Sequence, residues 1–511
     1  MKRINQGKLI ILGLLLAAAV YLRFYNLTNT VLFLGDQGRD AIIVADIFRQ
    51  KDLVFIGPVT SVGNLYLGPL YYYFMLPFLW LTYPSPVGPA YAVAALGVIT
   101  VYLMYSLGKK LIGENGALIA TFFYTFAATI VHATRYSWNP NPAPFVSLLM
   151  IYTTYLAWQK HPKYWVAVAG CFSILLQLHY LTLLALPAAG LIWLISLRTH
   201  FSTGKLKAIL LPSLIGLVIF LLSLVPLVLF DLKHQGVNFR AFQAMFTGNE
   251  NFTALRETSV TRQLTETLQE TEGRGLHILF EYMIGKNRVL NQTLLLAVVI
   301  LFCVTILNKH EQKQPLAKEF VLLSYLGFGI VGTAFYQHSI FDHYIAYLFP
   351  ITALVYGYVF SRLKPRWLAA VAFIIFTAYF LRFNWPQLIF KDTGWTIKDI
   401  EHTSQEILKR VESGEKYNLV LLSGSKDLDG QNYRYFLTTG HTRPVPPEQR
   451  NEVTTLFIID EEKQSPKVID LPIYEIVVFP NKQPAEVFTL ENGPTITVLR
   501  RTTQETDQAL E

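Results

Sequence analysis

Gly35-Asp36-Gln37-Gly38-Arg39-Asp40-Ala41 is the polar stretch that follows the first apolar run, residues 9–20, and the rest of the chain can be read as a scaffold that holds it. Its pattern predicts a helix from Asp36 to about Gln50, with Asp36 as the N-cap. Because Asp36 and Asp40 are four residues apart, both carboxylates lie on one face of that helix, with Arg39 beside them. Further along the helix this face is apolar, so the charges form a polar group in the first turn only.

Two interpretations of this polar group stay open on the local sequence. In the first, Asp36 caps the helix and Arg39 is a surface ion-pair partner. In the second, Asp36 is a general base that faces a substrate, and Arg39 holds an anion, because a guanidinium group matches phosphate oxygens. The choice between them depends on the rest of the chain.

The composition is that of a membrane protein. Of the 511 residues, 52% are hydrophobic and only 15% are charged. Nearly uncharged runs long enough to cross a bilayer recur from Leu9 to about Phe383, which predicts a polytopic α-helical membrane protein. The net charge of +8 lies largely in short loops between these runs, so it concerns membrane orientation rather than nucleic acid. Both cysteines, Cys171 and Cys303, lie inside apolar runs, and a disulfide framework is not expected.

Lysines and arginines beside the apolar runs predict the topology. They place the N-terminus in the cytoplasm, and the first run is expected to stay as a span, because no small-residue cleavage site follows it. Alternation of the loops then predicts about eleven spans. The piece from Pro69 to Tyr83 is short and contains Pro77, so it is expected to enter and leave on one side. The expected spans are the run from Leu9 and then 88–108, 116–134, 143–158, 164–180, 181–197, 208–230, 292–307, 319–336, 344–360 and 367–383.

Residues 1–383 are thus expected to form the membrane-embedded domain, and residues 384–511, of ordinary soluble composition, a small extracytoplasmic α/β domain. Trp395–Val411 has helical periodicity. Four short β-branched runs predict strands at 419–422, 455–459, 475–479 and 495–499. The C-terminal part contains no glycine-rich phosphate loop, metal-ligand spacing or nucleophile elbow, so it is expected to bind or pack rather than to carry chemistry.

The predicted topology collects the unusual polar residues at the outer surface. Each group has an ordinary explanation when taken alone, such as an interfacial side chain or a turn. Groups from four separated stretches at one membrane surface exceed what anchoring needs, and together they indicate a cavity open to the outer leaflet that binds a phosphate-bearing lipid. The groups are Asp36 with Arg39 and Asp40; His132, Arg135, Asn139 and Asn141; Gln177, His179 and Tyr180; and His338, Asp342, His343 and Tyr344.

The stretch Asp36-Gln-Gly-Arg39-Asp40-Ala41 resembles the first outer-loop motif of the polyprenyl-phosphate-sugar-dependent integral membrane glycosyltransferases of the C-type fold. That group includes the protein O-mannosyltransferases and the lipid A aminoarabinose transferases. Gly68-Pro69-Leu70-Tyr71-Tyr72-Tyr73 resembles the Pro-Pro-Leu-Tyr-Tyr segment that follows in them. Lys109-Lys110-Leu111-Ile112-Gly113 and His343-Tyr344 with Pro350 also resemble family features. The resemblance covers roughly residues 8–383 and leaves out the C-terminal domain.

The resemblance implies a glycosyltransferase that moves a sugar, with inversion, from a polyprenyl-phosphate donor to an acceptor on the extracytoplasmic side of the plasma membrane. It implies Asp36 as the acid that deprotonates or orients the acceptor, and Arg39 as a contact to the donor phosphate. Many members have a second acid where this chain has Gln37, so a tightly held metal is not expected and no cofactor is predicted. The remaining predicted substrate contacts are Asp40, Tyr66, Arg135, Asn139, His179, Asp342, His343 and Tyr344.

Two other functions stay open. A transporter or flippase of a lipid-linked sugar tends to show internal repeats and polar groups at the membrane midplane, and neither is visible in the sequence. A catalytically inactive homologue would bind the lipid-linked sugar and recruit a partner through the C-terminal domain. The expected partners are the donor, membrane lipids and a glycan, lipid or protein acceptor that the sequence does not name; nucleic acid is not expected.

Overall fold

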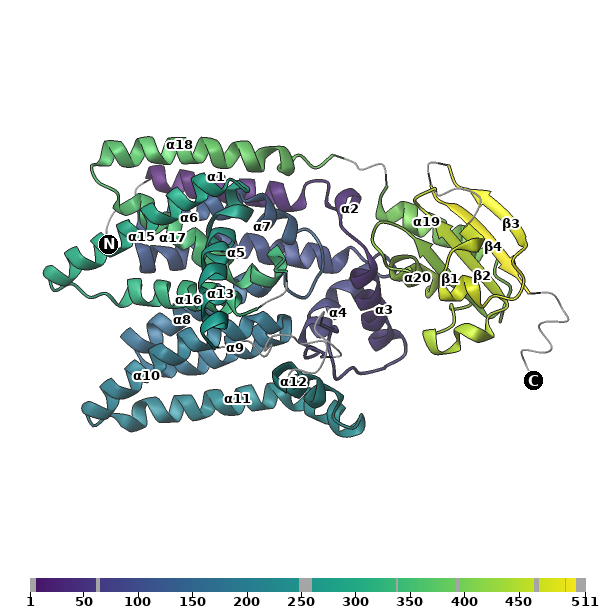
Figure 1. Ribbon diagram of the computed structural model, residues 1–511, viewed down its shortest axis with the longest axis horizontal. Helices are drawn as coiled ribbons and strands as arrows, with labels where there is room; N and C mark the ends of the chain where they lie inside the picture. Colours follow the sequence, from purple (N-terminus) through teal and green to yellow (C-terminus); the bar gives the residue numbers. More distant parts are fainter. Residues whose placement is uncertain are drawn as a thin grey trace.

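The computed structural model describes residues 6–60, 65–247, 260–336, 339–391, 395–463, 468–491 and 493–501. Figure 1 shows a bundle of long helices that run roughly parallel, followed at one end by a small α/β domain. His338, which the sequence places in an outer polar group, lies outside the described residues.

The membrane domain is formed by helices that follow one another along the chain. The helices are α1 (Gln6–Phe24), α2 (Leu27–Thr30), α3 (Gly35–Arg49), α4 (Leu70–Thr82), α5 (Gly88–Ile112), α6 (Glu114–Phe126), α7 (Ala128–Ala133), α8 (Ala143–Gln159), α9 (Trp165–Leu178), α10 (Leu186–Ser202), α11 (Leu206–Lys233), α12 (Val237–Thr247), α13 (Val260–Leu276), α14 (Tyr282–Ile284), α15 (Arg288–Glu311), α16 (Ala317–Ala334), α17 (Phe349–Arg362) and α18 (Arg366–Asn384). Short helical turns connect them at η1 (Pro162–Tyr164), η2 (Tyr180–Ala185), η4 (His277–Glu281), η5 (Asp342–Leu348) and η6 (Trp385–Leu388).

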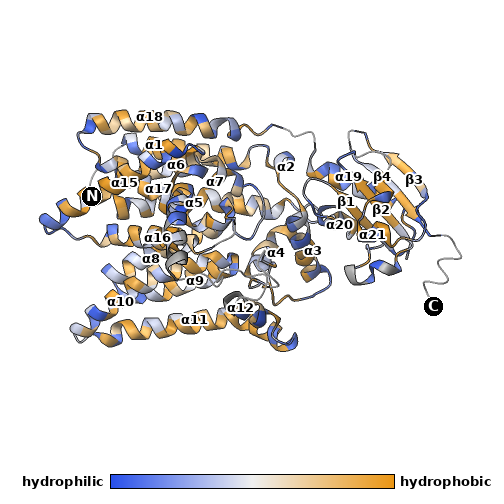
Figure 2. Ribbon diagram, in the orientation of Figure 1, coloured by the Kyte–Doolittle hydropathy of each residue, from blue (hydrophilic) through white to orange (hydrophobic). Residues whose placement is uncertain are grey.

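Eight helical stretches of the described chain are long and apolar enough to cross a membrane, and each coincides with an expected span. The remaining three expected spans fall on shorter helices: α6 has 13 residues and is separated from α7 at Ala127, α8 has 17 and α9 has 14. The predicted number of about eleven therefore exceeds the number of helices that meet this length. Figure 2 shows apolar residues along the long helices, and hydrophilic ones toward their ends and around α3.

The centre of the bundle is α17, which is almost entirely buried and packs against α5 and α6. Gly116 and Gly357 let α6 and α17 approach closely, because a Cβ built on Gly357 would lie 2.1 Å from the Gly116 carbonyl oxygen. In contrast, few residues of α11 and α15 are buried. Their apolar side chains face outward, as expected for helices whose backbone groups are satisfied internally and whose surface meets lipid.

Helices α3 and α4 lie at the end of the bundle that faces the C-terminal domain (Figure 1). α4 has 13 residues, contains Pro77 and is not among the helices long enough to cross a membrane. It packs against α3 and α5, with Tyr71 and Tyr72 fully enclosed. This pair of helices therefore forms a layer between the long helices and the C-terminal domain.

The C-terminal domain is a four-stranded sheet with short helices. Its elements are α19 (Ile397–Leu408), β1 (Tyr417–Leu422), α20 (Gln431–Leu437), η7 (Pro447–Glu452), β2 (Thr455–Asp460), η8 (Val468–Asp470), α21 (Tyr474–Val477), β3 (Pro484–Thr489) and β4 (Thr495–Arg500). The strand order is β1-β2-β4-β3, with β1 and β2 parallel and the other pairs antiparallel. The predicted α/β class is confirmed.

The predicted strand at 475–479 is wrong, because this segment begins in the short helix α21. Its apolar residues do not alternate between two faces: Ile476 is buried, whereas Val477 and Val478 are exposed. The strand that the sequence does not reveal is β3, an edge strand that is almost wholly exposed and starts at Pro484. Such a strand lacks the alternating apolar pattern that marks a half-buried one.

The C-terminal domain docks on the membrane domain through α3. Arg443 Nη2 lies 2.7 Å from Asp46 Oδ1, and Arg49 Nη1 donates a 2.9 Å hydrogen bond to the Thr438 carbonyl. Helix α20 lies along α3 over most of its length. At the first turn of α3, which carries the polar stretch, Gly38 lies directly against Gln431 of the C-terminal domain.

Candidate functional site

Helix α3 begins one residue earlier than predicted, and Asp36 does not cap it. The N-cap position is Leu34, whose N–H donates a 3.0 Å hydrogen bond to Gln37 Oε1. The prediction that Asp36 is the N-cap is therefore wrong, because the buried Gln37 amide already accepts from the free N–H at the helix start. Gln37 therefore has a structural role at the start of α3.

Arg39 is held between two carboxylates. Its Nη1 lies 2.8 Å from Asp36 Oδ1, and its Nη2 and Nε lie 2.8 and 3.0 Å from Asp40 Oδ1. Tyr72 from α4 donates a further 3.1 Å hydrogen bond to the same Asp40 oxygen. The Asp40 side chain is only 1% exposed, whereas that of Asp36 is 46% exposed. Asp40 is thus the anchor of Arg39, and Asp36 is the carboxylate that faces open space.

Burial raises the pKa of Asp40 to about 6, against the stabilising effect of the Arg39 guanidinium. Its second oxygen, Oδ2, has no hydrogen-bond partner in the described part of the chain. Burial also disfavours the charge of Arg39, but Asp40, Tyr72 and Asp36 hold the pKa of its guanidinium above the ordinary value. Arg39 therefore stays charged, while Asp40 changes its charge in the mildly acidic range.

A cavity of about 150 Å³, the small cavity, lies against Asp36 and Arg39. Six of the predicted site residues line it, namely Asp36, Arg39, Asn139, His179, His343 and Tyr344. The other lining residues are Val59, Thr60, Leu67, Trp138, Pro140 and Tyr180. Four stretches that are distant in sequence therefore meet at one place, as the polar groups of the sequence indicate.

Two wall residues of the small cavity are fixed by hydrogen bonds around the end of α9. Asn139 Nδ2 donates a 2.6 Å hydrogen bond to the Leu178 carbonyl. His179 Nδ1 accepts a 3.2 Å hydrogen bond from the N–H of Leu181, which leaves a ring proton on Nε2. Both side chains therefore hold the wall in place as well as lining it.

The indole of Trp138 lies against the imidazole of His343, with ring centroids 4.2 Å apart. Neither Trp138 Nε1 nor the ring nitrogens of His343 make a hydrogen bond to a residue that the structure describes. The cavity wall thus offers polar N–H groups to a ligand. The sequence alone does not single out Trp138, which lies between the predicted site residues Arg135 and Asn139.

The structure does not bring Arg135 to this site, contrary to its predicted contact with the donor phosphate. Its guanidinium donates to the carbonyls of Leu22 and Tyr25 at 2.7 and 2.9 Å and to Thr30 Oγ1 at 2.6 Å. The same group stacks on the ring of Phe390 at 3.6 Å. These contacts fasten the end of α1 to the following segment, so Arg135 has a structural role here.

Two further predicted residues lie outside the small cavity. The N–H of Tyr66 donates a 2.8 Å hydrogen bond to Asn238, and its ring packs on Phe230 at the end of α11. Asp342 lies 3.2 Å from His277 Nε2. Asp342, which is 43% exposed, connects η5 to η4 through this contact.

A wider cavity of about 450 Å³, the interdomain cavity, opens beside the same turn of α3. Its membrane-domain wall is formed by Leu32, Leu34, Gly35, Asp36, Gln37, Arg39, Tyr136 and Trp138. Its other wall belongs to the C-terminal domain and is formed by Ser425, Lys426, Asp427, Asp429 and Gln431. Asp36, Arg39 and Trp138 line both cavities, so the two spaces meet at Asp36.

Residues 68–227, from the start of α4 to α11, match the family model of the dolichyl-phosphate-mannose-protein mannosyltransferases. A search of curated proteins gives no match.

Among solved structures, ArnT from Cupriavidus metallidurans bound to undecaprenyl phosphate is 14% identical, with a TM-score of 0.51 over 95% of this chain and 97% of that chain. The apo state of the same protein gives equal values. The archaeal oligosaccharyltransferase AglB from Archaeoglobus fulgidus, in complex with an inhibitory peptide and a dolichol-phosphate, is 12% identical, with a TM-score of 0.49 over 92% of this chain and 71% of that chain. The resemblance that the sequence indicates is confirmed, since residues 68–227 match the mannosyltransferase family model and the fold of the chain is similar to that of ArnT.

Proposed function

We propose that this protein transfers a sugar from a polyprenyl-phosphate donor to an acceptor hydroxyl, with Asp36 as the general base. The observation that carries the proposal is the position of Asp36, a half-exposed carboxylate at the junction of two cavities. The buried carboxylate of Asp40 holds the Arg39 guanidinium in place beside Asp36. Capping cannot explain Asp36, because Gln37 performs it.

The donor phosphate is assigned to the small cavity. Its volume of about 150 Å³ suits a phosphate group with part of a sugar, so the polyprenyl chain extends along the membrane domain. Arg39 supplies a fixed positive charge, and the N–H groups of Trp138 and His343 are available for phosphate oxygens. The undecaprenyl phosphate bound by ArnT supports a donor of this kind.

The site attracts an anionic donor only when one of its titratable groups takes up a proton. With both carboxylates ionised, Asp36, Arg39 and Asp40 carry a formal charge of −1, which repels a phosphodiester. Asp40, with a pKa raised by burial to about 6, takes up a proton more readily beside a bound anion. The imidazole of His343 gains proton affinity in the same way. Donor binding thus lowers the negative charge of its own site.

The transfer step then needs one base and one cation. The acceptor hydroxyl attacks the anomeric carbon, Asp36 takes the hydroxyl proton, and the bond between that carbon and the phosphate oxygen breaks. Polyprenyl phosphate leaves with the electron pair of this bond, and Arg39 stabilises the charge that develops on it. Inversion requires the acceptor and the leaving phosphate on opposite faces of the sugar, and the two cavities that meet at Asp36 provide a place for each.

The reaction takes place on the extracytoplasmic side of the plasma membrane, which the charge distribution along the chain supports. It uses no resident metal ion, because Arg39 and the neighbouring N–H groups are available to meet the phosphate.

The test is donor consumption by the purified full-length protein in lipid nanodiscs. A panel of polyprenyl-phosphate sugars labelled in the sugar is supplied with pooled glycan, lipid and peptide acceptors, and release of polyprenyl phosphate is measured. We expect release for at least one donor, at a rate that falls in Asp36→Asn but not in the control Asp52→Asn, an exposed aspartate in the segment after α3. Donor that crosses the bilayer uncleaved, after reconstitution of the same protein into sealed liposomes, would instead identify a transporter.

A further inference from the structure

We propose that the interdomain cavity is the acceptor site and that residues 423–431 of the C-terminal domain make it specific for a carbohydrate. This inference rests on the proposed function, because the term acceptor assumes that a sugar is transferred at Asp36. The sequence assigns no chemistry to the C-terminal domain, yet one complete wall of this cavity belongs to it.

The loop between β1 and α20 is fixed against the first turn of α3. A Cβ built on Gly38 would lie 2.3 Å from the carbonyl oxygen of Gln431, and one built on Gly35 would lie 2.6 Å from Asp427 Oδ2. Both glycines are therefore needed for the close approach of the two domains. The loop thus lies directly against the first turn of α3, through the backbone of Gln431 at Gly38 and the side chain of Asp427 at Gly35.

The loop also has an ordered internal structure. Asp427 Oδ2 accepts a 2.7 Å hydrogen bond from the N–H of Gln431 at the start of α20, and the hydroxyls of Ser423 and Ser425 are 2.6 Å apart. Lys426 has a φ of 59°, a left-handed conformation that is unfavourable for a side chain larger than glycine. Strain of this kind persists where the surroundings impose it and is found at ligand sites. The backbone of the loop at Lys426 is thus held in a defined turn, in which the Lys426 N–H donates a 3.1 Å hydrogen bond to the Ser423 carbonyl.

Two charged side chains of the loop line the cavity without a hydrogen bond or an ion pair of their own in the described part of the chain. The ammonium of Lys426 and the carboxylate of Asp429 both line it, and neither makes a hydrogen bond or an ion pair with any residue within the described ranges. Other charged side chains of this domain form ion pairs, for example Lys416 with Glu452 and Arg450 with Glu475. Lys426 and Asp429 are therefore free to serve a ligand.

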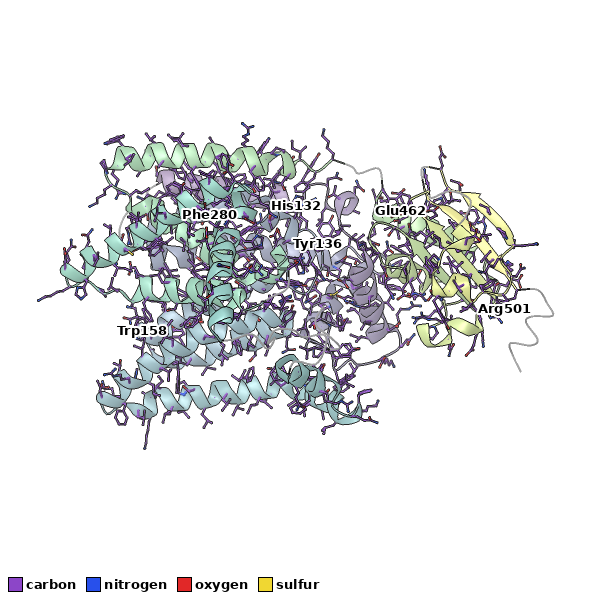
Figure 3. The ribbon with its side chains drawn as sticks, in the orientation of Figure 1. His132, Tyr136, Trp158, Phe280, Glu462 and Arg501 are labelled. Atoms are coloured by element: carbon purple, nitrogen blue, oxygen red, sulfur yellow. The ribbon has the colours of Figure 1, made fainter. Side chains whose placement is uncertain are left out.

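The opposite wall adds aromatic surface. The rings of Tyr136 and Trp138 have centroids 6.0 Å apart, and both line the cavity. Figure 3 shows Tyr136 toward the end of the helical bundle that faces the C-terminal domain. A ligand in this cavity therefore meets aromatic rings on one side, and an ammonium and a carboxylate on the other.

This combination matches a carbohydrate. Sugar hydroxyls both donate and accept hydrogen bonds, so they satisfy Lys426 and Asp429 together, and the C–H face of a sugar ring packs against aromatic rings. The volume of about 450 Å³ lies in the range of small-molecule sites and accommodates a short oligosaccharide end. An apolar lipid chain would leave both charged groups without partners, which is unfavourable once water is excluded.

The test is direct binding of two defined pools to the full-length protein in nanodiscs, followed by saturation-transfer NMR. One pool contains neutral di- and trisaccharides, and the other contains short peptides with serine and threonine. We expect signals from the saccharide pool, with affinity that falls roughly ten- to hundredfold in Lys426→Ala and in Asp429→Asn. The matched controls Lys398→Ala and Asp470→Asn change exposed residues of the same domain and should leave binding unchanged.

Binding of peptides alone, or saccharide binding that is equal in the loop variants and the parent, would overturn this inference. So would the absence of saccharide binding. The donor assay of the proposed function is separate. A protein that binds saccharides through Lys426 and Asp429 but never cleaves a donor would refute the proposed transfer and leave the carbohydrate site in place.

Discussion

Asp40 is expected to make donor binding depend on pH, and Asp40→Asn should remove this dependence. The donor phosphodiester is an anion throughout the range from pH 5 to 8. Asp40, with a pKa of about 6, is protonated at the acidic end and ionised at the other. Because a second negative charge repels the donor, the affinity of the parent protein should fall as the pH rises through 6.

The magnitude follows from the contact through Arg39. Asp40 Oδ1 lies 2.8 Å from Arg39 Nη2, and a phosphate on the far side of the guanidinium would be roughly 7 Å from the Asp40 charge. At an effective dielectric constant of about 20, two like charges at that separation repel by roughly 2 kcal/mol, or about thirtyfold in Kd. The asparagine variant is neutral at every pH, so it should bind as the parent does at pH 5.

The assay is the Kd of a non-cleavable phosphonate analogue of the donor, measured by calorimetry in nanodiscs at pH 5, 6, 7 and 8. Asp52→Asn, which removes an exposed carboxylate further along, is the control and should keep the slope of the parent. If the Kd of Asp40→Asn still depends on pH, the group whose titration controls binding is another one, with His343 as the first candidate. A parent protein with no slope would refute the reasoning about Asp40 altogether.

The stability of the folded protein should also depend on pH through the charge of Asp40. A carboxyl whose pKa rises from 3.8 to about 6 on folding binds more protons in the folded state between those values. Its contribution to stability is therefore full below about pH 4 and is lost as the pH rises through 6, by roughly 3 kcal/mol. Measured in detergent, the Tm of Asp40→Asn relative to the parent should thus increase from pH 4 to pH 7. A constant difference would contradict the buried state of Asp40.

Other variants distinguish residues that bind the donor from residues that hold the fold or the domain contact. Arg39→Ala should weaken binding of the phosphonate analogue roughly ten- to hundredfold. Arg135→Ala should lower Tm and leave the Kd of the analogue unchanged, since its guanidinium bonds only protein oxygens among the described residues; equal effects of the two variants on Kd would contradict the assigned phosphate site. Gly38→Val should separate α3 from Gln431 and abolish transfer. Gly424→Ala, with open space around the glycine, should leave transfer unchanged. Limited proteolysis between the domains measures the separation. Removal of divalent cations by EDTA should leave turnover unchanged, and a loss restored by added Mg²⁺ or Mn²⁺ would place a metal at the phosphate.

Much of the membrane domain could be predicted from sequence, because long apolar helices are encoded locally. The runs that became α5, α11 and α18 need only length and composition to be recognised. The shorter helices differ, because protein packing replaces lipid around them. Helix α6 ends at Phe126, and α9 ends at Leu178, where His179 follows in an extended conformation. Their lengths are decided by neighbours that a local pattern does not reveal.

The candidate site was predictable to the extent that topology places segment ends together. Asp36, Asn139, His179 and His343 come from separate stretches and line one cavity. Arg135 comes from the same end of the bundle, but its side chain points to carbonyls at the end of α1. Sequence predicts that a residue is near a surface, whereas the direction of a long side chain depends on which partners are within reach.

The contact between the C-terminal domain and the first turn of α3 was hidden for a similar reason. Helix α20 is only seven residues long, and its significance lies in Gly35 and Gly38 of α3, which allow it to approach. Glycines in a first helical turn read as flexibility or as part of a motif. Only the contact with residues some 390 positions away explains them.

The most direct measurement of the central claim is the single-turnover rate of sugar transfer in Asp36→Asn, with the donor Kd measured on the same preparation. Asp36 does not cap α3, so the variant should keep the parent fold and Tm. The account predicts donor binding within a few-fold of the parent and a transfer rate lower by on the order of 10²–10⁴. Transfer near the parent rate by a folded Asp36→Asn protein would contradict the assignment of Asp36 as the base.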